Sequence, residues 1–510
     1  MKGALLIAGT HSDAGKSVLT AGICRWLHRQ GVSVAPFKAQ NMALNSVVTI
    51  AGAEVGRAQA VQAAAAGVEL EAAMNPILIK PSGERHSQVI VMGEPYADAD
   101  ARSYREMKHE LRPLVAAALA DLRERFDVVV CEGAGSPAEI NLRDSDLTNM
   151  WLAGEARLPT LIVADIDRGG VFASLFGTLA LLSAEDQAQV AGFVINKFRG
   201  DHSILAPGLT QLQTMTGRPT LGVLPYVEDL WMDVEDSLAL EGAGARPEVA
   251  PEAGGQTLEV AVIRLRYISN FTDADALSAE PGVRVRFTRS AADLERADLV
   301  IVPGTKATVE DLERLRATGL DKALAARAAA GAPILGICGG YQLLGERIED
   351  EVESRRGTVD GLGLLPVQTR FEPTKILRRN QSAASWFGTA ASGYEIRHGR
   401  VSRSGGEPLI DDDGCVLGPV IGTSWHAALE HDGFRRAVLT WVAERRGRRF
   451  VPGRRPFSQA RATRLDALGD LVERQLDTAA LTNLIERGAP TDLPIIETEV
   501  RALAALRDNR

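Results

Sequence analysis

The feature that most constrains the fold is a glycine-rich loop between an apolar segment and an amphipathic one near the N-terminus. The apolar run Leu5–Ala8 precedes the loop Gly9-Thr10-His11-Ser12-Asp13-Ala14-Gly15-Lys16-Ser17, and the amphipathic segment extends to Leu27. Strand, glycine-rich loop with Gly-Lys-Ser, and helix together are typical of phosphate-binding loops. In these loops backbone N–H groups and the helix dipole bind phosphate oxygens. The sequence therefore predicts a nucleotide-binding α/β domain.

Individual residues of this loop have distinct predicted roles. Lys16 is expected to reach the β- and γ-phosphates, and the Ser17 hydroxyl is expected to bind Mg²⁺. The spacing of the loop is one residue longer than the usual pattern, and it resembles the variant loop of dethiobiotin-synthetase-like ATPases. A chance Gly-Lys-Ser turn is the alternative, but it leaves the flanking strand and helix unexplained. The other loop residues expected to contact the nucleotide are Gly9, Thr10, Asp13 and Gly15.

Later apolar segments predict the remainder of a P-loop NTPase-like, doubly wound parallel sheet. Phe126–Cys131, Leu161–Asp165 and Val190–Asn196 read as buried strands, and alanine-rich helical segments alternate with them. Glu132 follows the first of these strands. A carboxylate at the carboxyl end of a parallel strand can face the phosphate-binding loop. We therefore predict Glu132 as a second Mg²⁺ ligand, with a solvated loop acid as the alternative.

A second strand–turn–helix unit in the other half of the chain carries a cysteine at its turn. Ala332–Ile337 is apolar, Cys338-Gly339-Gly340 follows, and a helix is expected near Tyr341. A thiol under the free N–H groups of a helix N-terminus is stabilised as the reactive thiolate. Hydrolases use the same elbow to present a nucleophilic serine. The pattern predicts a cysteine nucleophile, and a buried structural cysteine is the alternative.

A histidine downstream has the context of a partner for this cysteine. His426 follows a short apolar strand in the stretch Ile421–Glu430. An adjacent base activates a thiol by taking its proton and orienting the thiolate. We therefore predict Cys338 and His426 as the catalytic pair.

Several polar stretches resemble, in order along the chain, the cobyric acid synthase family of glutamine-dependent amidoligases in cobalamin synthesis. The resemblance covers about residues 1–445. No single stretch decides it. The stretches of the first half are Phe37–Ser46, Met74–Pro76, Glu132–Leu142, Ala164–Phe172 and Asn196–Asp201.

The resemblance implies a reaction in two parts. ATP converts a corrinoid carboxylate to an acyl phosphate, because oxide is too poor a leaving group for direct attack by ammonia. Glutamine supplies the ammonia. ATP and Mg²⁺ are the implied cofactors. Lys38, together with Gln40, Asn41 and Asn45, would lie near the phosphate or the substrate carboxylate, and Asn196 would contact adenine. The alternative for both stretches is a hydrogen-bonded structural loop.

The second half is similar to class I glutamine amidotransferases, which implies a flavodoxin-like α/β domain. The corner after the strand Asp298–Val302 would place the N–H of Thr305, with that of Gly339, in an oxyanion hole. In that class a Glu usually stands two residues after the histidine, but here the position is Ala428. Glu430 is the nearest acid, so it is a candidate for the third catalytic residue. A Cys–His pair without an acid is the alternative.

The implied substrate is adenosylcobyrinic acid a,c-diamide, amidated at the b, d, e and g carboxylates to give cobyric acid. Two alternatives remain. One is the sibling enzyme that amidates the a and c carboxylates, and the other is a P-loop regulatory ATPase with an inactive amidotransferase domain. Phe37–Ser46 and Asp165–Phe172 favour the first assignment over the sibling. The intact Cys338 and His426 pair argues against the regulatory ATPase.

Composition shifts predict the domain organisation. Residues 1–240 are expected to form the amidoligase domain, residues 241–257 a linker rich in Gly, Ala, Pro and Glu, and residues 258–447 the amidotransferase domain. Residues 448–510 are expected to form a helical tail, to which we assign no function. One face of its predicted helix carries Leu465, Leu468, Leu471, Val472 and Leu476.

Composition also excludes some classes of protein. A net charge of −9 disfavours binding to nucleic acid or to an anionic membrane. Four cysteines without a C-x-x-C pair favour a reducing cytoplasm over a disulfide framework. The apolar N-terminal run breaks into the glycine-rich loop, so it is predicted to be a strand and not a signal peptide. No apolar run is long enough to span a membrane. The oligomeric state is left open.

Overall fold

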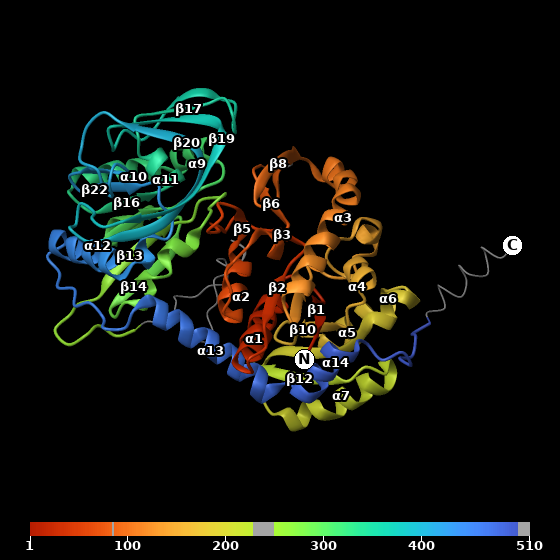
Figure 1. Ribbon diagram of the computed structural model, residues 1–510. Helices are drawn as coiled ribbons and strands as arrows, with labels where there is room; N and C mark the ends of the chain where they lie inside the picture. The colour runs from red at the N-terminus through yellow and green to blue at the C-terminus, as the bar shows by residue number, and fades with distance from the viewer. Residues whose placement is uncertain (84–85, 228–248, 498–510) are drawn as a thin grey trace.

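The computed structural model describes residues 1–83, 86–227 and 249–497 of the 510-residue chain. These residues form two α/β lobes, which meet along one side (Figure 1). Residues 241–248 of the predicted linker and residues 498–510 of the predicted tail lie outside the described residues.

The first lobe is built on a sheet of six parallel strands in the order β12-β11-β10-β1-β9-β2. Along β1, Leu5 and Ile7 belong to one apolar core, and Leu6 and Ala8 belong to the other. Both faces of the sheet are therefore covered, as expected for a doubly wound parallel sheet. The strands are β1 (Gly3–Gly9), β2 (Val34–Phe37), β9 (Val128–Glu132), β10 (Thr160–Asp165), β11 (Val190–Phe198) and β12 (Thr220–Pro225).

Helices alternate with these strands, which confirms the predicted fold class of this lobe. Helix α1 begins directly after the glycine-rich loop, and Gly15 precedes it with a left-handed φ of 104°. The helices are α1 (Lys16–Arg29), α2 (Arg57–Ala66), α3 (Ala101–Arg125), α4 (Met150–Ala156), α5 (Val171–Leu181), α6 (Ala184–Gln189) and α7 (His202–Thr216).

The first lobe also contains a smaller sheet and a hairpin that the sequence pattern did not predict. The polar stretch Phe37–Ser46 does not form one loop, because parts of it pair as short strands. The small sheet has the order β3-β6-β7-β8, and β4 pairs antiparallel with β5. The strands are β3 (Gln40–Met42), β4 (Ser46–Val48), β5 (Glu54–Gly56), β6 (Ile77–Pro81), β7 (Ser87–Val91) and β8 (Glu94–Ala99).

The second lobe is built on the strand order β14-β13-β15-β16-β22-β21. Its strands are parallel except for the edge strand β21, which pairs antiparallel with β22. The strands are β13 (Leu258–Ile263), β14 (Val283–Thr288), β15 (Leu299–Val302), β16 (Ile334–Ile337), β21 (Cys415–Leu417) and β22 (Val420–Thr423). The helices are α8 (Ala291–Arg296), α9 (Thr308–Thr318), α10 (Leu320–Ala329), α11 (Gly339–Leu343) and α12 (Asp432–Arg445).

A second sheet lies beside this core, in the order β18-β17-β19-β20. Its long antiparallel pair, β19 and β20, faces the first lobe, where β4 contacts it (Figure 1). The strands are β17 (Arg347–Asp350), β18 (Gly357–Asp360), β19 (Val367–Ser382) and β20 (Ala391–Arg403).

The parallel topology explains why residues distant in sequence meet. The carboxyl ends of parallel strands lie on one edge of a sheet. In the first lobe this edge carries the loop after β1, Glu132 at the end of β9 and Asn196 near the end of β11. In the second lobe it carries Cys338 after β16 and His426 after β22.

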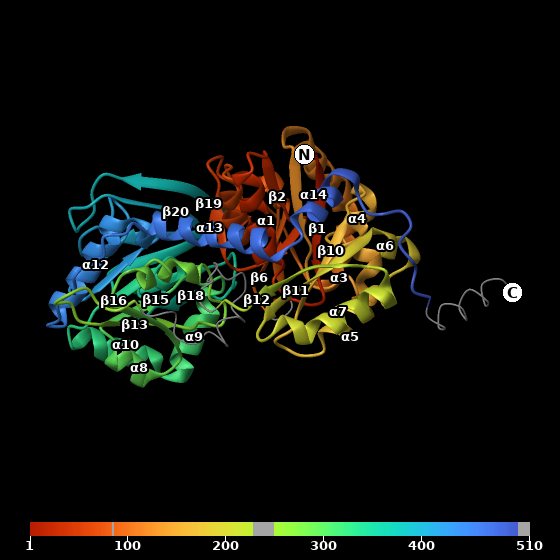
Figure 2. The same cartoon turned by 90° about the horizontal axis from the view of Figure 1, so that it is seen from below.

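The C-terminal segment crosses back to the first lobe. Helix α13 (Phe457–Gln475) packs along α1, and α14 (Thr478–Arg487) packs near β1 (Figure 2). The predicted apolar face is confirmed, because Leu465, Leu468 and Val472 are buried in the core that α1 shares. The approach is close at Gly22, where a Cβ atom would lie 2.9 Å from the Leu468 carbonyl oxygen.

In the part of the chain that the structure describes, every helix is too short or too polar to cross a bilayer.

Candidate functional site

The strand–turn–helix elbow around Cys338 in the second lobe has the geometry predicted for it. Cys338 lies between β16 and α11 with φ 51° and ψ −109°, an unusual backbone conformation for a non-glycine residue. The Cys338 N–H donates to the Thr423 carbonyl at 2.8 Å, and the thiol donates to the Ile396 carbonyl at 3.7 Å. The neighbouring strands β22 and β20, which carry Thr423 and Ile396, therefore hold the cysteine in this strained conformation. Elbows that present a nucleophile have the same kind of strain.

His426 is brought to Cys338 as predicted, and its acidic partner is Asp273. On one side, the imidazole of His426 forms a hydrogen bond with Cys338. On the other side, His426 Nδ1 lies 2.7 Å from Asp273 Oδ2. Asp273 Oδ1 accepts from the Ala427 N–H at 2.6 Å, so the carboxylate binds both the imidazole ring and the backbone next to it. The three side chains form a Cys–His–Asp arrangement.

The prediction of Glu430 as the third catalytic residue is wrong. Glu430 forms ion pairs with Arg57 at 2.5 Å and with Arg461 at 2.9 Å, and both partners lie outside the amidotransferase core. Asp273 was missed because it precedes the histidine by 153 residues and has no local spacing to it. Only a survey of every acid in the second half of the chain could have found it, since triads are recognised by geometry and not by chain order.

The electrostatic setting keeps the His426 imidazole protonated. Burial is the largest influence and lowers the pKa of His426, but the charges and hydrogen bonds of Asp273 and Cys338 outweigh it and raise this pKa from 6.5 to about 10. The arrangement therefore favours a charged imidazolium next to the Asp273 carboxylate.

The predicted oxyanion donors lie next to each other. A Cβ atom at Gly339 would lie 2.8 Å from the backbone nitrogen of Thr305, so the two corners are in close contact. Thr305 Oγ1 donates to Asp311 at 2.5 Å. Gly304 is also needed for close approach, because a Cβ there would lie 2.8 Å from His426 Cε1. The role of the two N–H groups stays a prediction.

In the first lobe, the glycine-rich loop wraps around Lys16. Lys16 Nζ donates to the His11 carbonyl at 2.9 Å and to the Gly135 carbonyl at 3.2 Å. The Thr10 hydroxyl oxygen is buried and has no hydrogen-bond partner within residues 1–83, 86–227 and 249–497. Buried polar atoms normally have a hydrogen-bond partner, so this hydroxyl is available to a ligand or a water molecule. Gly9 and Gly15 let the loop close tightly, since a Cβ at Gly9 would lie 3.0 Å from the Lys16 side chain.

The predicted metal ligands Ser17 and Glu132 lie side by side. Ser17 Oγ donates to Glu132 Oε1 at 2.7 Å. Lys38 Nζ donates to the same oxygen at 3.0 Å, and Gln62 donates to Oε2 at 2.5 Å. Burial is the largest influence on the pKa of Glu132 and raises it. The Lys38 charge and the three hydrogen bonds outweigh burial and hold that pKa below its usual value. Glu132 is therefore a buried carboxylate anion, not a solvated loop acid.

Asn196 and Asp13 are placed at the loop in different ways. Asn196 Nδ2 donates to the Ala14 carbonyl at 3.0 Å and leaves no room for a side chain at Gly15. The amide thus supports the phosphate-binding loop directly, and its contact with adenine stays a prediction. Asp13 is exposed, has a left-handed φ of 58° and lies 3.6 Å from Arg168.

The predicted polar residues between Lys38 and Asn45 contact different parts of the molecule. Lys38 pairs with Glu132. The Gln40 side chain accepts from the Tyr104 hydroxyl at 2.6 Å, and Asn41 donates to Gln59 at 2.9 Å inside the lobe. Asn45, expected near the phosphate or the substrate, instead accepts from the Phe271 N–H of the second lobe at 3.2 Å. Of this set, Lys38 contacts the predicted metal ligand Glu132, and Gln40 lines the cavity beside the phosphate-binding loop.

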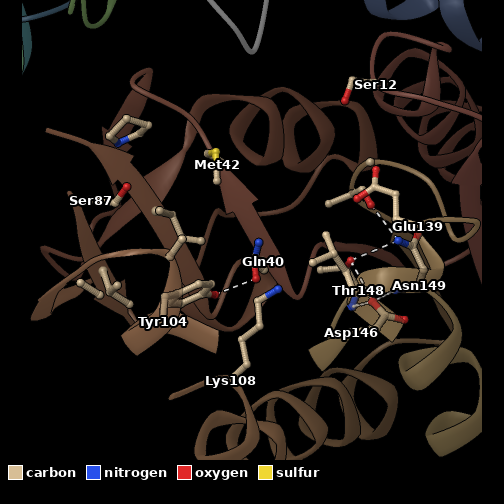
Figure 3. A pocket seen from close by; sticks show the side chains of 18 of the residues that line it. Ser12, Gln40, Met42, Ser87, Tyr104, Lys108, Glu139, Asp146, Thr148 and Asn149 are labelled. Carbon is tan, nitrogen blue, oxygen red and sulfur yellow. Dashed lines mark hydrogen bonds between the residues drawn. The ribbon is translucent and has the colours of Figure 1, made fainter. Parts of the chain in front are cut away.

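A cavity of about 700 Å³ opens beside the phosphate-binding loop. Ser12 of that loop lies on its wall, and Tyr104, Lys108 and Gln40 reach into it from α3 and β3 (Figure 3). Burial lowers the pKa of Lys108. The volume falls within the usual range of small-molecule sites, about 300 to 1,000 Å³. The cavity is therefore of a size that suits a small-molecule site, and it lies next to the predicted phosphate-binding loop.

Two family models match the chain. The CobQ/CobB/MinD/ParA nucleotide binding domain matches residues 5–239. The CobB/CobQ-like glutamine amidotransferase domain matches residues 259–434. The two matches correspond to the two lobes.

Curated relatives match nearly the whole chain. A protein of Frankia casuarinae is 59% identical, and the match covers 97% of this chain and 99% of the relative. Proteins of Streptomyces avermitilis and Streptomyces coelicolor are 58% and 59% identical, with the same shares covered. All three relatives are named cobyric acid synthase.

Proposed function

The chain belongs to the cobyric acid synthase family, and from this premise we propose that it amidates the b, d, e and g carboxylates of adenosylcobyrinic acid a,c-diamide. It is a glutamine-dependent amidoligase of cobalamin synthesis. We assign activation of the carboxylate to residues 1–240 and release of ammonia from glutamine to residues 258–447. The observation that carries the proposal is the identity of 58–59% to the named relatives over 97% of this chain. In addition, both sites have the side chains that the reaction needs.

In the glutaminase site, the Cys338 thiolate attacks the amide carbon of glutamine. His426 donates a proton to the leaving ammonia, and a γ-glutamyl thioester remains. His426 then takes a proton from the water that hydrolyses the thioester to glutamate. Asp273 keeps the imidazole oriented and stabilises its charge throughout. The N–H groups of Gly339 and Thr305 hold the oxyanion.

The first prediction concerns the pH dependence of glutamine hydrolysis, which should depend on the charge of Asp273. With the His426 pKa raised to about 10, the imidazolium persists until the pH rises through that value. Its stabilising contribution is complete below pH 6.5 and is lost as the pH approaches 10. Glutamine hydrolysis should therefore decline only above about pH 10. In Asp273→Asn the buried imidazole loses its counter-charge, so the decline should begin at a lower pH, and kcat should fall by about a hundredfold.

Glutamate release measured across pH tests this. Ammonia-dependent amidation by the same variant is the control, because it bypasses the glutaminase site. If glutamine hydrolysis by Asp273→Asn declined at the same high pH as in the wild type, the role assigned to Asp273 would be contradicted.

In the synthetase site, Lys16 and the loop N–H groups bind the β- and γ-phosphates of ATP and stabilise the charge that develops on the transferred phosphoryl group. Lys38 is positioned for the same charge or for the acceptor carboxylate. The acceptor carboxylate enters the cavity lined by Gln40, Tyr104 and Lys108. The acyl phosphate formed there has phosphate as its leaving group, which ammonia from the second lobe displaces.

The residues present fit a magnesium ion that is shared with the nucleotide. Mg²⁺ is usually held by one or two protein oxygens together with substrate phosphates and water. Ser17 Oγ and the Glu132 carboxylate, which are in contact, would supply the protein ligands. In the described residues there is no cluster of three or more His, Cys, Asp or Glu side chains that could form a cage. When bound, the ion would neutralise charge on the transferred phosphoryl group.

The second prediction tests the metal. Glu132→Gln keeps the shape of the side chain and removes its charge, so the Mg²⁺ concentration for half-maximal amidation should rise at least tenfold. Melting curves should accompany the titration, because the buried ammonium of Lys38 loses its counter-ion. Gln62→Glu is unsuitable as a control, since it adds charge at the site. Glu310→Gln, on α9 of the other lobe, removes an acid elsewhere and should leave the titration unchanged. An unchanged Mg²⁺ titration in Glu132→Gln would remove this residue from the metal site.

The proposed substrate is tested by mass spectrometry of corrinoids incubated with ATP, Mg²⁺ and glutamine. Each amidation replaces a hydroxyl by an amino group, so a product series ending at four replacements is expected from the a,c-diamide. Amidation of the unamidated corrinoid at a and c would instead support the sibling activity. ATP hydrolysis without any amidated product would support a regulatory ATPase. The near full-length relatives and the assembled Cys–His–Asp group favour the first outcome.

A further inference from the structure

One strand of the synthetase lobe reaches the loop that carries the catalytic acid. At the start of β4, the Ser46 N–H donates to Asn270 Oδ1 at 2.8 Å. In return, the Phe271 N–H donates to Asn45 Oδ1 at 3.2 Å. Asn45, Ser46 and Asn270 are 1%, 0% and 2% exposed, so the two hydrogen bonds form in an environment without competing water. The reciprocal pair fixes the position of the 270–271 backbone relative to the first lobe.

The segment fixed in this way leads directly to Asp273. Asn270 has a left-handed φ of 49° and precedes the short 3₁₀ helix η4 (Phe271–Ala274). The Asp273 N–H donates to the Asn270 carbonyl at 2.9 Å. Asn270 thus starts the turn that aims the Asp273 carboxylate at His426. Asparagine tolerates the left-handed conformation, and its side-chain oxygen supplies the acceptor for Ser46.

A second contact joins the same residue of β4 to the catalytic histidine. The Tyr394 hydroxyl donates to the Ser46 carbonyl at 3.0 Å. Tyr394 in turn exchanges two backbone hydrogen bonds with His426, at 3.0 and 2.8 Å, and its ring lies 5.6 Å from the imidazole. The backbone of Ser46 therefore contacts the supports of both the acid and the histidine.

Ser46 itself is anchored within the first lobe. Its hydroxyl donates to Glu54 at 2.8 Å and accepts from Lys80 at 2.9 Å, and Lys80 forms a buried ion pair with Glu54 at 2.7 Å. Lys80 lies on β6, and its neighbours Ile79 and Pro81 line the acceptor cavity. A charged, hydrogen-bonded and water-free network of this kind is rigid.

We propose that Ser46 of the synthetase lobe is a positioning residue of the glutaminase site, because it holds the Asp273 turn through Asn270 and the His426 backbone through Tyr394. This inference rests on the proposed function, in which Cys338, His426 and Asp273 hydrolyse glutamine. It adds that the glutaminase site is correctly oriented only when it is docked on β4.

The test removes the side-chain acceptor for Ser46. Asn270→Gly keeps the left-handed backbone and deletes only the carboxamide. A displaced acid misaligns the imidazole, so kcat for glutamine hydrolysis should fall by roughly tenfold to a hundredfold. The KM for glutamine and the rate of ammonia-dependent amidation should stay at wild-type values. The matched control is Arg355→Gly, at an exposed position of the same lobe with φ 56°, which should retain both activities.

Tyr394→Phe provides a second test if the glycine variant does not fold. It keeps the ring and the backbone pair with His426 and removes the hydroxyl, which reaches Ser46 and also hydrogen-bonds Arg57, both of the first lobe. We expect kcat for glutamine to fall several-fold or more, roughly the effect of one or two buried hydrogen bonds, with ammonia-dependent amidation again unchanged. Tyr96→Phe, at an exposed position on β8, is its control.

Two results would overturn the inference: a wild-type kcat for glutamine in both variants, or an equal loss with glutamine and with ammonia. Failure of the underlying function is separable from failure of the positioning role. If Cys338→Ser still hydrolyses glutamine, the proposed glutaminase site is wrong. If Cys338→Ser is inactive and Asn270→Gly hydrolyses glutamine normally, only the positioning role is wrong.

Discussion

Replacing Cys338 with serine should abolish amidation from glutamine and leave amidation from ammonium salts intact. The hydroxyl keeps the volume of the thiol, but it ionises far less readily and cannot make the same attack on the amide. The acyl phosphate forms in the other lobe, beside Lys16 and Lys38, and ammonia from solution reaches it without the thioester. Product formation should be measured with each nitrogen source, at a pH high enough to supply free NH₃.

The protein contains a matched control for this change. Cys415 is buried in the same lobe, and its thiol donates to the Gly405 carbonyl at 3.5 Å, which a hydroxyl can also do. Cys415→Ser should therefore retain glutamine-dependent amidation. Equal loss with both nitrogen sources in Cys338→Ser would mean that Cys338 is structural, and full activity with glutamine would place the nucleophile elsewhere.

Replacing Lys16 with alanine should abolish amidation with either nitrogen source. Lys16 is the loop cation nearest the predicted phosphates, and it also ties the loop together through the His11 and Gly135 carbonyls. Loss of one preorganised group that stabilises developing charge costs on the order of a hundredfold to a thousandfold in rate. Amidated corrinoid and released phosphate measure the effect.

Glutamate release by Lys16→Ala provides the internal comparison. Cys338, His426 and Asp273 are all in the other lobe, so glutamine hydrolysis should continue in this variant. Lys322→Ala, at an exposed position on α10, should keep both activities. Near wild-type amidation by Lys16→Ala would exclude Lys16 from phosphoryl transfer.

The features that could be predicted from sequence are those with a local physical signature. A strand, a tight turn and a helix that follow one another, as around Lys16 and Cys338, leave a continuous pattern of apolar and glycine residues. Glu132 lies beside Ser17 for a related reason. Strands β1 and β9 are parallel neighbours, so the loop that leads from β1 into α1 meets the carboxyl end of β9.

The features that could not be predicted depend on contacts between distant segments. Asp273 has no periodic or spacing relation to His426, and only the folded second lobe brings them to 2.7 Å. Glu430 was closer in sequence, but it turns toward Arg57 of the first lobe. Asn45, which the family resemblance implied near the phosphate or the substrate carboxylate, has a backbone N–H of the other lobe as its partner. Polarity indicates that a side chain needs a partner but not which one.

The return of α13 to α1 has a consequence for how this protein could be divided. Leu465, Leu468 and Val472 complete the apolar core over the helix that follows the phosphate-binding loop. Each fully buried side chain of this kind contributes about 1.5 to 3 kcal/mol. If the gene were split at a single point between the lobes, α13 would be encoded with the second lobe. The ATP-binding half would therefore lack part of its own apolar core. Inheritance as two separate subunits would require the last helices to be moved to the first gene, whereas a fused gene needs no such rearrangement.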